Sequence, residues 1–297
     1  MVMDKAVLDA SGNSVADSQA LLSDWSIEVT PRTAAKIGDF RELLPAGTRI
    51  YIAHVDGTAF ADMASTAKRL NDEGFAVMPH LPARSFASVG ELEEVLRTYR
   101  GEADVRQALL LAGGIAKPRG TLASSIDLIE TGLFDKMGFT QLNIAGHPEG
   151  NRDIDADGGT AQVDAALRWK VDFASRTDAQ LAIVTQFAFD ASVIVNWAER
   201  IAALQIGLPI HVGIAGPAKL QTLIKYAISC GVGPSLKVLQ KRALDLRKLL
   251  MPYEPTEIVT QLCAYKAANP HSTISRLHLF PLGGIEPAAR WIRDFRP

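Results

Sequence analysis

The amino-acid sequence predicts an α/β protein in which eight parallel β-strands close into a single (β/α)8 TIM barrel. Short apolar segments rich in β-branched residues alternate with longer segments of helical periodicity, which is typical of βαβ units. Eight strand segments of this kind occur, and eight buried strands fit a closed barrel better than a doubly wound sheet. The length of 297 residues suits one such barrel.

Each expected strand is a short apolar run. The eight runs are Trp25–Val29, Arg49–His54, Phe75–Met78, Gln107–Leu111, Gln141–Ala145, Gln180–Thr185, Pro209–Val212 and Arg276–Phe280. After the second strand, apolar residues line one face of a helix over Ala59–Asn71, and Gly74 ends this helix. Ser88 begins the next helix, with Glu91 three residues later in a capping-box pattern. The last strand leads into a terminal helix over Glu286–Asp294.

Two regions fall outside the repeating pattern. Residues 1–24 are predicted to be an N-terminal helical extension, with a polar helix over Val15–Ser23 that covers the bottom of the barrel. More than 60 residues separate the seventh and eighth strands, which leaves room for two or three helices in place of one. We find no repeat, low-complexity segment or linker, so residues 25–297 are predicted to form one catalytic domain.

The composition is that of an ordinary globular protein, with 47% hydrophobic and 22% charged residues. A net charge of -2 offers no basic surface to nucleic acid or to an anionic membrane. No apolar stretch approaches the roughly 20 residues that span a bilayer, and no secretory signal is visible. We therefore expect a cytoplasmic protein, and homo-oligomer formation stays open. Cys230 and Cys263 have no metal-binding spacing and are predicted to be small buried hydrophobes.

Glu28 is the strongest candidate for catalysis. It stands between Ile27 and Val29 near the end of the first strand, and barrel active sites lie where strands end at the C-terminal rim. Apolar surroundings raise the pKa of a carboxyl group above its usual value of about 4.3, so that it can donate a proton at neutral pH. The alternative is a structural Glu that pairs with an Arg or Lys at the rim.

Histidines lie at or near five of the expected strands. They are His54, His80, His147, His211 and His278. Such a pattern is compatible with a metal-dependent barrel hydrolase, which takes ligands from several strands. No His-x-His pair follows the first strand, however, and each histidine is equally well explained as a hydrogen-bonded rim residue. We predict no metal site.

Two further strand ends carry candidate binding residues. Gly113 and Gly114 follow the fourth strand, where they would let the backbone approach a flat or phosphate-bearing ligand, although tight turns also use such pairs. Gln186, Phe187 and Phe189 follow the sixth strand. An amide beside two aromatic rings suits an aromatic heterocycle, and the alternative is a core pair of phenylalanines with a polar amide at the rim.

Several motifs, taken in chain order, resemble those of the methylenetetrahydrofolate reductase family. Ser26–Pro31 resembles the opening Phe-Glu-Phe-Phe-Pro motif, and Pro79–Leu81 resembles Pro-His-Leu-Thr. The other matches are Ala145–Gly150 to Gly-Tyr-Pro-Glu-Gly, Leu167–Asp172 to Leu-Lys-x-Lys-Val-Asp, Thr185–Asp190 to Thr-Gln-Phe-Phe-Phe-Asp, and more weakly Val212–Ile214 and Leu277–Phe280. The resemblance depends on their number, order and spacing.

This resemblance implies an oxidoreductase of one-carbon metabolism that reduces 5,10-methylenetetrahydrofolate to 5-methyltetrahydrofolate. NAD(P)H would be the co-substrate, and FAD the cofactor that supplies the hydride chemistry. By motif match Glu28 would be the acid that opens the five-membered ring of the folate. Residues on the substrate would be Gln186, Phe187, Phe189 and Gly114. Residues on the flavin would be His54, His80, Gly113, Ala123, His147, Asp164 and Lys170.

The chain departs from the family pattern at three places, all on the flavin side. Ala112–Gly114 replaces Arg-Gly-Asp, His147 replaces a tyrosine, and Leu122 replaces the first residue of a Tyr-Ala pair. Folate binding is therefore better supported than flavin binding, and direct hydride transfer from the nicotinamide stays open. The alternatives are a folate-dependent methyl-group transferase or carrier on the same barrel, and the metal-dependent hydrolase.

Overall fold

A computed structural model of the chain describes residues 21–232, 237–240 and 251–296. Eight strands follow one another in a closed barrel, and this confirms the predicted fold class. They are β1 (Ser26–Val29), β2 (Arg49–Ile52), β3 (Ala76–Pro82), β4 (Gln107–Leu111), β5 (Gln141–Gly146), β6 (Gln180–Thr185), β7 (Ile210–Ala215) and β8 (Ile274–Phe280). The strands from β1 to β5 pair in parallel in chain order, and β7 pairs in parallel with β8.

Strands β4 and β6 have the predicted bounds, whereas β3 is longer than predicted. The sequence Pro-His-Leu-Pro was expected to end the third strand at Met78. In the structure Pro79 is the last residue of β3 that pairs with β2, and from His80 the strand pairs with β4. This change of partner lets β3 continue through a proline, and it places His80 inside the strand.

Contacts between Cα atoms divide the chain into two compact units, and we describe each by itself. Unit 1 contains Met1–Trp25, His147–Val163 and Thr185–Pro297, and unit 2 contains Ser26–Gly146 and Asp164–Val184. The expectation of a single domain over residues 25–297 stays a prediction.

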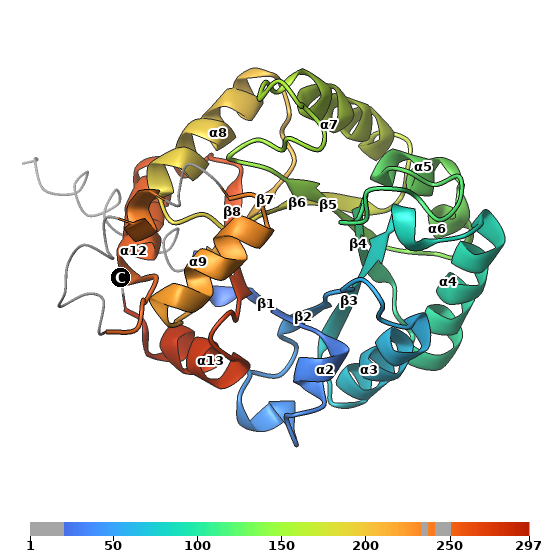
Figure 1. Cartoon of the computed structure of the whole chain (residues 1–297), viewed down its shortest axis with the longest axis horizontal. Helices are drawn as coiled ribbons and strands as arrows, with labels where there is room; N and C mark the ends of the chain where they lie inside the picture. Colours follow the sequence, from blue (N-terminus) through green and yellow to red (C-terminus); the bar gives the residue numbers. More distant parts are fainter. Residues whose placement is uncertain (1–20, 233–236, 241–250, 297) are drawn as a thin grey trace, which may run out of the picture. The chain divides into compact units, whose positions relative to one another are not determined.

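Unit 2 holds most of α7 (Ala161–Ala174) and of β6, and strands β1 to β5 with their connecting helices. These are α2 (Pro31–Ala34), α3 (Phe60–Asp72), α4 (Val89–Ala103), α5 (Ser125–Glu130) and α6 (Leu133–Lys136). Helices α3 and α4 lie side by side, outside the strands of this unit (Figure 1). Gly74 follows α3 with a positive φ of 91°, as its predicted role as a helix stop requires. The Ser88 side chain accepts from Glu91 N, but the Glu91 carboxylate accepts from Ala87 N instead of closing a capping box.

Unit 1 holds α8 (Ala191–Ala203), β7, α9 (Leu220–Ser229), α12 (Thr256–Ala268), β8 and α13 (Ile285–Asp294). Helices α9 and α12 lie between β7 and β8, where extra helices were expected. Residues 21–23 are helical, and the rest of the helix expected over Val15–Ser23 lies outside the described residues. Cys263 is buried as predicted, and burial raises the pKa of its thiol to about 11. The prediction for Cys230 was wrong. This residue follows the last turn of α9 and is exposed.

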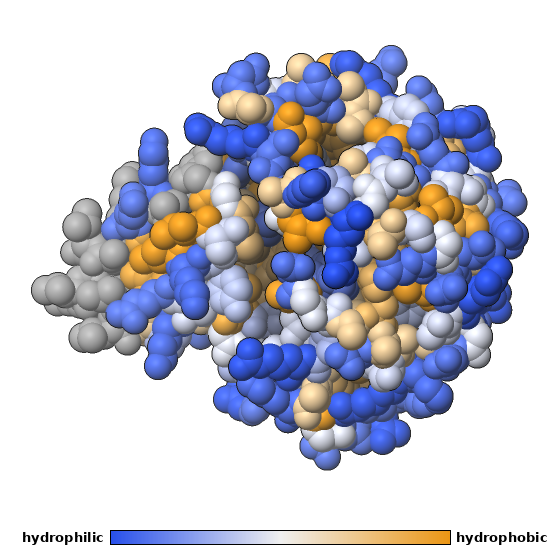
Figure 2. Space-filling view, turned by 45° about the vertical axis from the view of Figure 1, so that its right-hand side comes forward, coloured by the Kyte–Doolittle hydropathy of each residue, from blue (hydrophilic) through white to orange (hydrophobic). Residues whose placement is uncertain are grey.

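Most residues on the face shown in Figure 2 are hydrophilic, and hydrophobic residues form separate patches between them. The described helices include none that is both long and apolar enough to cross a membrane.

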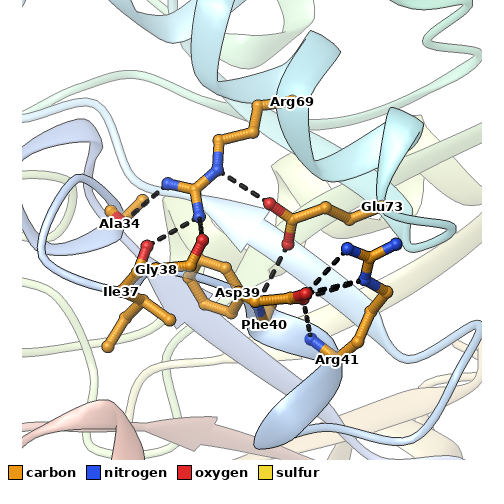
Figure 3. A network of polar contacts seen from close by, with 8 residues as sticks. All are labelled: Ala34, Ile37, Gly38, Asp39, Phe40, Arg41, Arg69 and Glu73. Carbon is orange, nitrogen blue, oxygen red and sulfur yellow. Dashed lines mark hydrogen bonds and ion pairs between the residues drawn. The ribbon is translucent and has the colours of Figure 1, made fainter.

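Arg69 of α3 fixes the segment that follows β1 and α2 (Figure 3). Its guanidinium donates to three backbone carbonyls of that segment, at Ala34 (3.1 Å), Ile37 (2.6 Å) and Gly38 (3.0 Å). Glu73 holds the guanidinium in place through a 2.8 Å contact with its Nε, and the other Glu73 oxygen accepts from Phe40 N at 3.0 Å. One ion pair therefore satisfies four backbone groups on the way from β1 to β2.

We predict that Arg69→Met lowers the free energy of unfolding by about 2–3 kcal/mol, because it leaves these carbonyls and Glu73 without their donor. Urea denaturation followed by circular dichroism measures this. The control is Arg41→Met. The Arg41 guanidinium pairs with Asp39 at the surface, so its removal should lower the free energy of unfolding much less. Equal losses for the two variants would show that the Arg69 network does not stabilise the fold.

Candidate functional site

Glu28 of β1 and His80 of β3 lie next to each other in unit 2. Glu28 Oε2 is 3.3 Å from His80 Nε2, and the two side chains are 19% and 12% exposed. The distance is that of an ion pair, but the geometry is not that of a hydrogen bond, so His80 Nε2 is buried without a hydrogen-bond partner in the described protein. A buried nitrogen of this kind can accept or donate one further hydrogen bond to a ligand.

The surroundings of Glu28 are not those that its neighbours in sequence suggest. Ile27 and Val29 are buried, but side chains alternate along a strand and both therefore point to the opposite face. Glu28 instead shares its face with Tyr51, its register partner on β2. The Glu28 carboxyl group thus lies on the face of Tyr51 and beside the imidazole of His80, where an Arg or Lys was the expected alternative.

His54 follows the end of β2 and lies on a short aromatic stack. Its ring is 5.0 Å from the ring of Phe60, which stacks at 4.6 Å and 7° on Phe86. Burial, and to a lesser extent the nearby His80, lower the pKa of the His54 imidazole. A cavity of about 350 Å³ opens beside it, with Glu91 and Arg119 among the other lining residues. This cavity has room for part of a planar ligand.

The loop after β4 holds three of the predicted cofactor and substrate residues. Gly113 has a φ of 96°, and a Cβ there would lie 2.9 Å from Pro82 Cβ, so glycine is required by the loop itself. Gly114 is exposed with open space around it. Ala123 is held by its backbone, because its carbonyl accepts from Arg84 Nε at 3.1 Å and its N–H donates to Asp127 at 2.7 Å. Sequence reasoning missed Arg84, which fixes this loop.

Asp164 and Lys170 lie on α7 (Ala161–Ala174), and both are buried. The Lys170 side chain is only 6% exposed, and it has no hydrogen-bond or ion-pair partner among the described residues. Burial lowers the pKa of its ammonium group to about 8. Burying a cation without a counter-ion is costly, so this position suits a protein that binds an anion there.

In unit 1, Gln186 lies directly after β6 and is partly buried. Its side-chain Oε1 accepts from Phe187 N at 3.1 Å, which leaves the amide N–H₂ group for another acceptor. Phe187 and Phe189 are 2% and 5% exposed and pack against Phe280 and Tyr253, with ring centroids 5.3 and 5.6 Å apart. This burial favours the core interpretation of the two phenylalanines over the predicted stacking on a ligand.

Three other residues of unit 1 explain parts of the motifs. His147 follows β5, and its carbonyl accepts from Gly150 N at 3.0 Å, which closes a turn. Thr185 Oγ1 accepts from Gly213 N at 2.8 Å, and a Cβ at Gly213 would come within 2.3 Å of the Thr185 carbonyl oxygen. This close approach of β6 and β7 accounts for the glycine of the Val-Gly-Ile motif.

Asp155 was missed by sequence reasoning. Its carboxylate is buried and accepts from Gln162 N at 2.8 Å and Val163 N at 3.0 Å, so it caps the start of α7. The cap lies several residues upstream of the helix, which is why no local pattern revealed it.

A polar pair inside unit 2 was also missed. Tyr51 and Asn143 are both fully buried, and Asn143 Nδ2 donates to Tyr51 Oη at 2.5 Å. The sequence feature that could have revealed this pair is a polar residue in the middle of each of the two apolar strands, β2 and β5. Within the described part of the chain, no three His, Cys, Asp or Glu side chains gather in a way that could hold a metal ion.

No family model matches the chain. A protein from Clostridium thermocellum that binds two copies of 5-methyl-5,6,7,8-tetrahydrofolic acid is similar in structure, with a TM-score of 0.53 and 12% identity, over 93% of this chain and 97% of that one. Dihydropteroate synthase from Anaplasma phagocytophilum, with bound 6-hydroxymethylpterin-monophosphate, has a TM-score of 0.44 and 11% identity, over 91% and 97%. The likeness to the Clostridium protein supports the barrel fold.

Lys170→Met should stabilise the unliganded protein at pH 7. The folded-state pKa of about 8 lies below the usual lysine pKa of 10.5, so between these pH values the unfolded chain binds more protons and stability rises with pH. Removing the buried charge should therefore raise the free energy of unfolding by about 1–3 kcal/mol at pH 7, and this advantage should disappear by about pH 10. Denaturation of both proteins from pH 6 to 10 measures the difference.

The matched control is Lys225→Met on α9, an exposed lysine that should show no such pH-dependent difference. If Lys170→Met destabilises the protein equally at all pH values, Lys170 is not a charged group buried at a cost.

Proposed function

We propose that the chain is a folate-dependent oxidoreductase that uses NAD(P)H to reduce 5,10-methylenetetrahydrofolate to 5-methyltetrahydrofolate, with Glu28 as the proton donor. The observation that carries this proposal is the pair formed by Glu28 and His80, 3.3 Å apart on the strands β1 and β3. Both side chains keep limited access to solvent at the end of the barrel where active sites are built.

The chemistry requires a proton at one atom of the substrate. The methylene carbon of the folate bridges two ring nitrogens, and the bond to one of them must break. Glu28 donates its proton to that nitrogen, which leaves as a neutral amine while the carbon becomes part of an iminium with the other nitrogen. A hydride that originates from NAD(P)H adds to this carbon and gives the methyl group. Glu28 is left as a carboxylate, takes up a proton from solvent, and can be stabilised by His80 in the meantime.

A folate substrate is supported by two further considerations. The structural neighbour from Clostridium thermocellum binds a methylated tetrahydrofolate. The side-chain amide of Gln186 keeps an N–H₂ group that its own backbone contact does not use, and such a group can pair with the edge of a pterin. In this role Gln186 would bind the substrate and take no part in proton transfer.

The residues of the chain fit a flavin in part. Lys170 is a buried cation without a partner in the described protein, which suits a phosphate, and His80 Nε2 has an unused hydrogen-bonding capacity. FAD, when bound, would supply the hydride-transfer chemistry between nicotinamide and folate. The positions at Ala112, Gly114 and Leu122 lack the polar side chains of the family pattern. Lys170, Asp164 and His80 are therefore the residues that we expect to hold the cofactor.

We expect Glu28→Gln to lower the folate-dependent oxidation of NAD(P)H by at least about a hundredfold, because the amide keeps the shape of the side chain but has no acidic proton. Steady-state kinetics with 5,10-methylenetetrahydrofolate measures the loss. Folate binding by calorimetry and oxidation of NAD(P)H by an artificial acceptor should both stay close to those of the unmodified protein.

The control is Glu149→Gln, at the next acidic residue in the motifs. Near-normal turnover by Glu28→Gln with a loss in Glu149→Gln would move the acid to Glu149. Tight folate binding without any oxidation of NAD(P)H by the unmodified protein would favour the methyl-group transferase or carrier.

If FAD is the cofactor, the purified protein should show flavin absorption, or acquire it when FAD is added. Lys170→Met should weaken FAD binding, and retention by the unmodified protein should fall above about pH 8, where Lys170 loses its proton. Spectroscopic titration with FAD at pH 7 and pH 9 tests both statements. A colourless protein with full folate-dependent activity would instead indicate direct hydride transfer from the nicotinamide.

A further inference from the structure

The cavity of about 350 Å³ beside His54 lies in unit 2, where the segments that follow β2, β3 and β4 come together. His54 and residues 56–60 line it from the loop after β2 and the start of α3. Ser85 and Glu91 line it from the segment after β3, and Arg119 lines it from the loop after β4. All three segments follow the C-terminal ends of parallel strands, which is the end of a barrel where ligands bind.

Several polar groups in the wall of this cavity are not used by the protein. Ser85 is 6% exposed, and its hydroxyl group makes no hydrogen bond with the described residues. The Arg119 guanidinium and the Asp56 carboxylate have no hydrogen-bond or ion-pair partner among those residues either. Glu91 accepts from Ala87 N through Oε2 at 2.6 Å, and its Oε1 makes no hydrogen bond in the described protein. Since buried polar groups are normally paired, the cavity suits a ligand that supplies both donors and acceptors.

Helix α3 begins in the wall of the cavity, and its first turn is not capped. Ala59 is the N-cap residue and has no side-chain oxygen that could accept from the helix. The N–H groups of Phe60 and Ala61 have no acceptor among the described residues. Such N–H groups carry partial positive charge and bind phosphate well. Together with the Arg119 guanidinium and the buried Ser85 hydroxyl, they provide donors for one phosphate group.

The two carboxylates of the cavity require a different part of the same ligand. Asp56 and Glu91, when ionised, can only accept hydrogen bonds, so they would repel a phosphate but bind hydroxyl groups. The neighbouring hydroxyl groups of a ribose are donors of this kind, and acidic residues bind them in dinucleotide sites. The rings of His54 and Phe60, 5.0 Å apart, also line the cavity and offer a flat surface to an attached base. A ribose phosphate therefore matches the groups that the cavity presents.

We propose that this cavity binds the ribose phosphate unit of a nucleotide, with its phosphate at Arg119 and the N-terminus of α3, and its hydroxyl groups at Asp56 and Glu91. NAD(P)H is the nucleotide that the proposed function requires, and only this assignment rests on that function. FAD contains the same unit, so the experiment compares the two nucleotides.

The position of the cavity agrees with a co-substrate that reaches the proposed acid. His80 contributes to the lowered pKa of His54, which lines the cavity, and His80 is the neighbour of Glu28. A nucleotide held by its ribose phosphate in this cavity would therefore be bound close to the pair of Glu28 and His80.

Calorimetric titration with ADP-ribose tests the site, because this probe carries ribose phosphate but neither a nicotinamide nor a flavin ring. Arg119→Met should weaken the binding of ADP-ribose by at least about tenfold, since a charged donor to the phosphate is lost. Ser85→Ala should weaken it less, because a neutral donor is lost. The matched control is Lys117→Met, which removes an exposed positive charge from the same loop but does not line the cavity, and it should bind ADP-ribose as the unmodified protein does.

Kinetics and flavin titration identify the nucleotide. If the site holds NAD(P)H, Arg119→Met should raise the KM for NADH or NADPH by about tenfold with little change in kcat, and FAD binding should not change. Weaker FAD binding with an unchanged KM would support the ribose phosphate site and assign it to the flavin.

Two results overturn the proposal. One is that the unmodified protein does not bind ADP-ribose, and the other is that Arg119→Met, whose side chain is exposed and not needed for folding, binds it equally well. Binding of ADP-ribose that depends on Arg119, in a protein that does not oxidise NAD(P)H with folate, would support the ribose phosphate site and overturn the proposed function.

Discussion

The interior of unit 2 depends on one property of parallel strands, which is that register partners send their side chains to the same face. Glu28, Tyr51 and Met78 are partners across β1, β2 and β3, so they form one row inside the barrel. A fully buried polar group in such a row, such as Tyr51, has no water to satisfy it and needs a partner on another strand. Once Glu28 is placed on β1, its surroundings are decided by the residues that the register brings beside it. Those include a tyrosine that accepts a hydrogen bond from Asn143, and a histidine.

The sequence predicted the strands of the barrel better than the contacts between side chains in its interior. The apolar runs of β4 and β6 defined those strands to the residue, because local hydrophobicity is enough to mark a buried strand. Glu28 could be chosen from its position alone. Its surroundings could not, since Tyr51, His80 and Asn143 come from three other strands and no local pattern shows which of them meet. The flanking Ile27 and Val29 suggested apolar surroundings, but the alternation of side chains turns both away. Similarly, Phe187 and Phe189 looked accessible only because the residues that bury them, Phe280 and Tyr253, come from distant segments.

The fold leaves several buried groups of unit 2 without a hydrogen-bond partner, Arg49 Nη1 and Tyr99 Oη among them, and two others lie at residues proposed for binding. Lys170 is buried as a cation with a lowered pKa, and His80 Nε2 is buried without a hydrogen bond, both within the described protein. Most buried polar groups are paired. The network of Arg69 and Glu73 is an example in which the pairing stabilises the fold. This contrast is the reason why we propose that Lys170 and His80 contact a ligand. Arg84 and Asp155, by contrast, are satisfied within the protein, by the Ala123 carbonyl and by the N–H groups of Gln162 and Val163.

The acid and the cofactor are separable parts of the proposed function. Glu28 and Tyr51 lie on β1 and β2, and hydrogen bonds link Arg49, at the start of β2, through Gln141 and Asn143 of β5 to Tyr51. The departures from the family pattern, at Ala112, Gly114 and Leu122, lie in the loop after β4 and touch none of these bonds. A change in how the hydride arrives would therefore leave the proton donor intact, because protonation of the leaving nitrogen is needed whether the hydride comes from a flavin or directly from a nicotinamide. The proposed acid at Glu28 is thus compatible with the altered loop after β4 within one barrel.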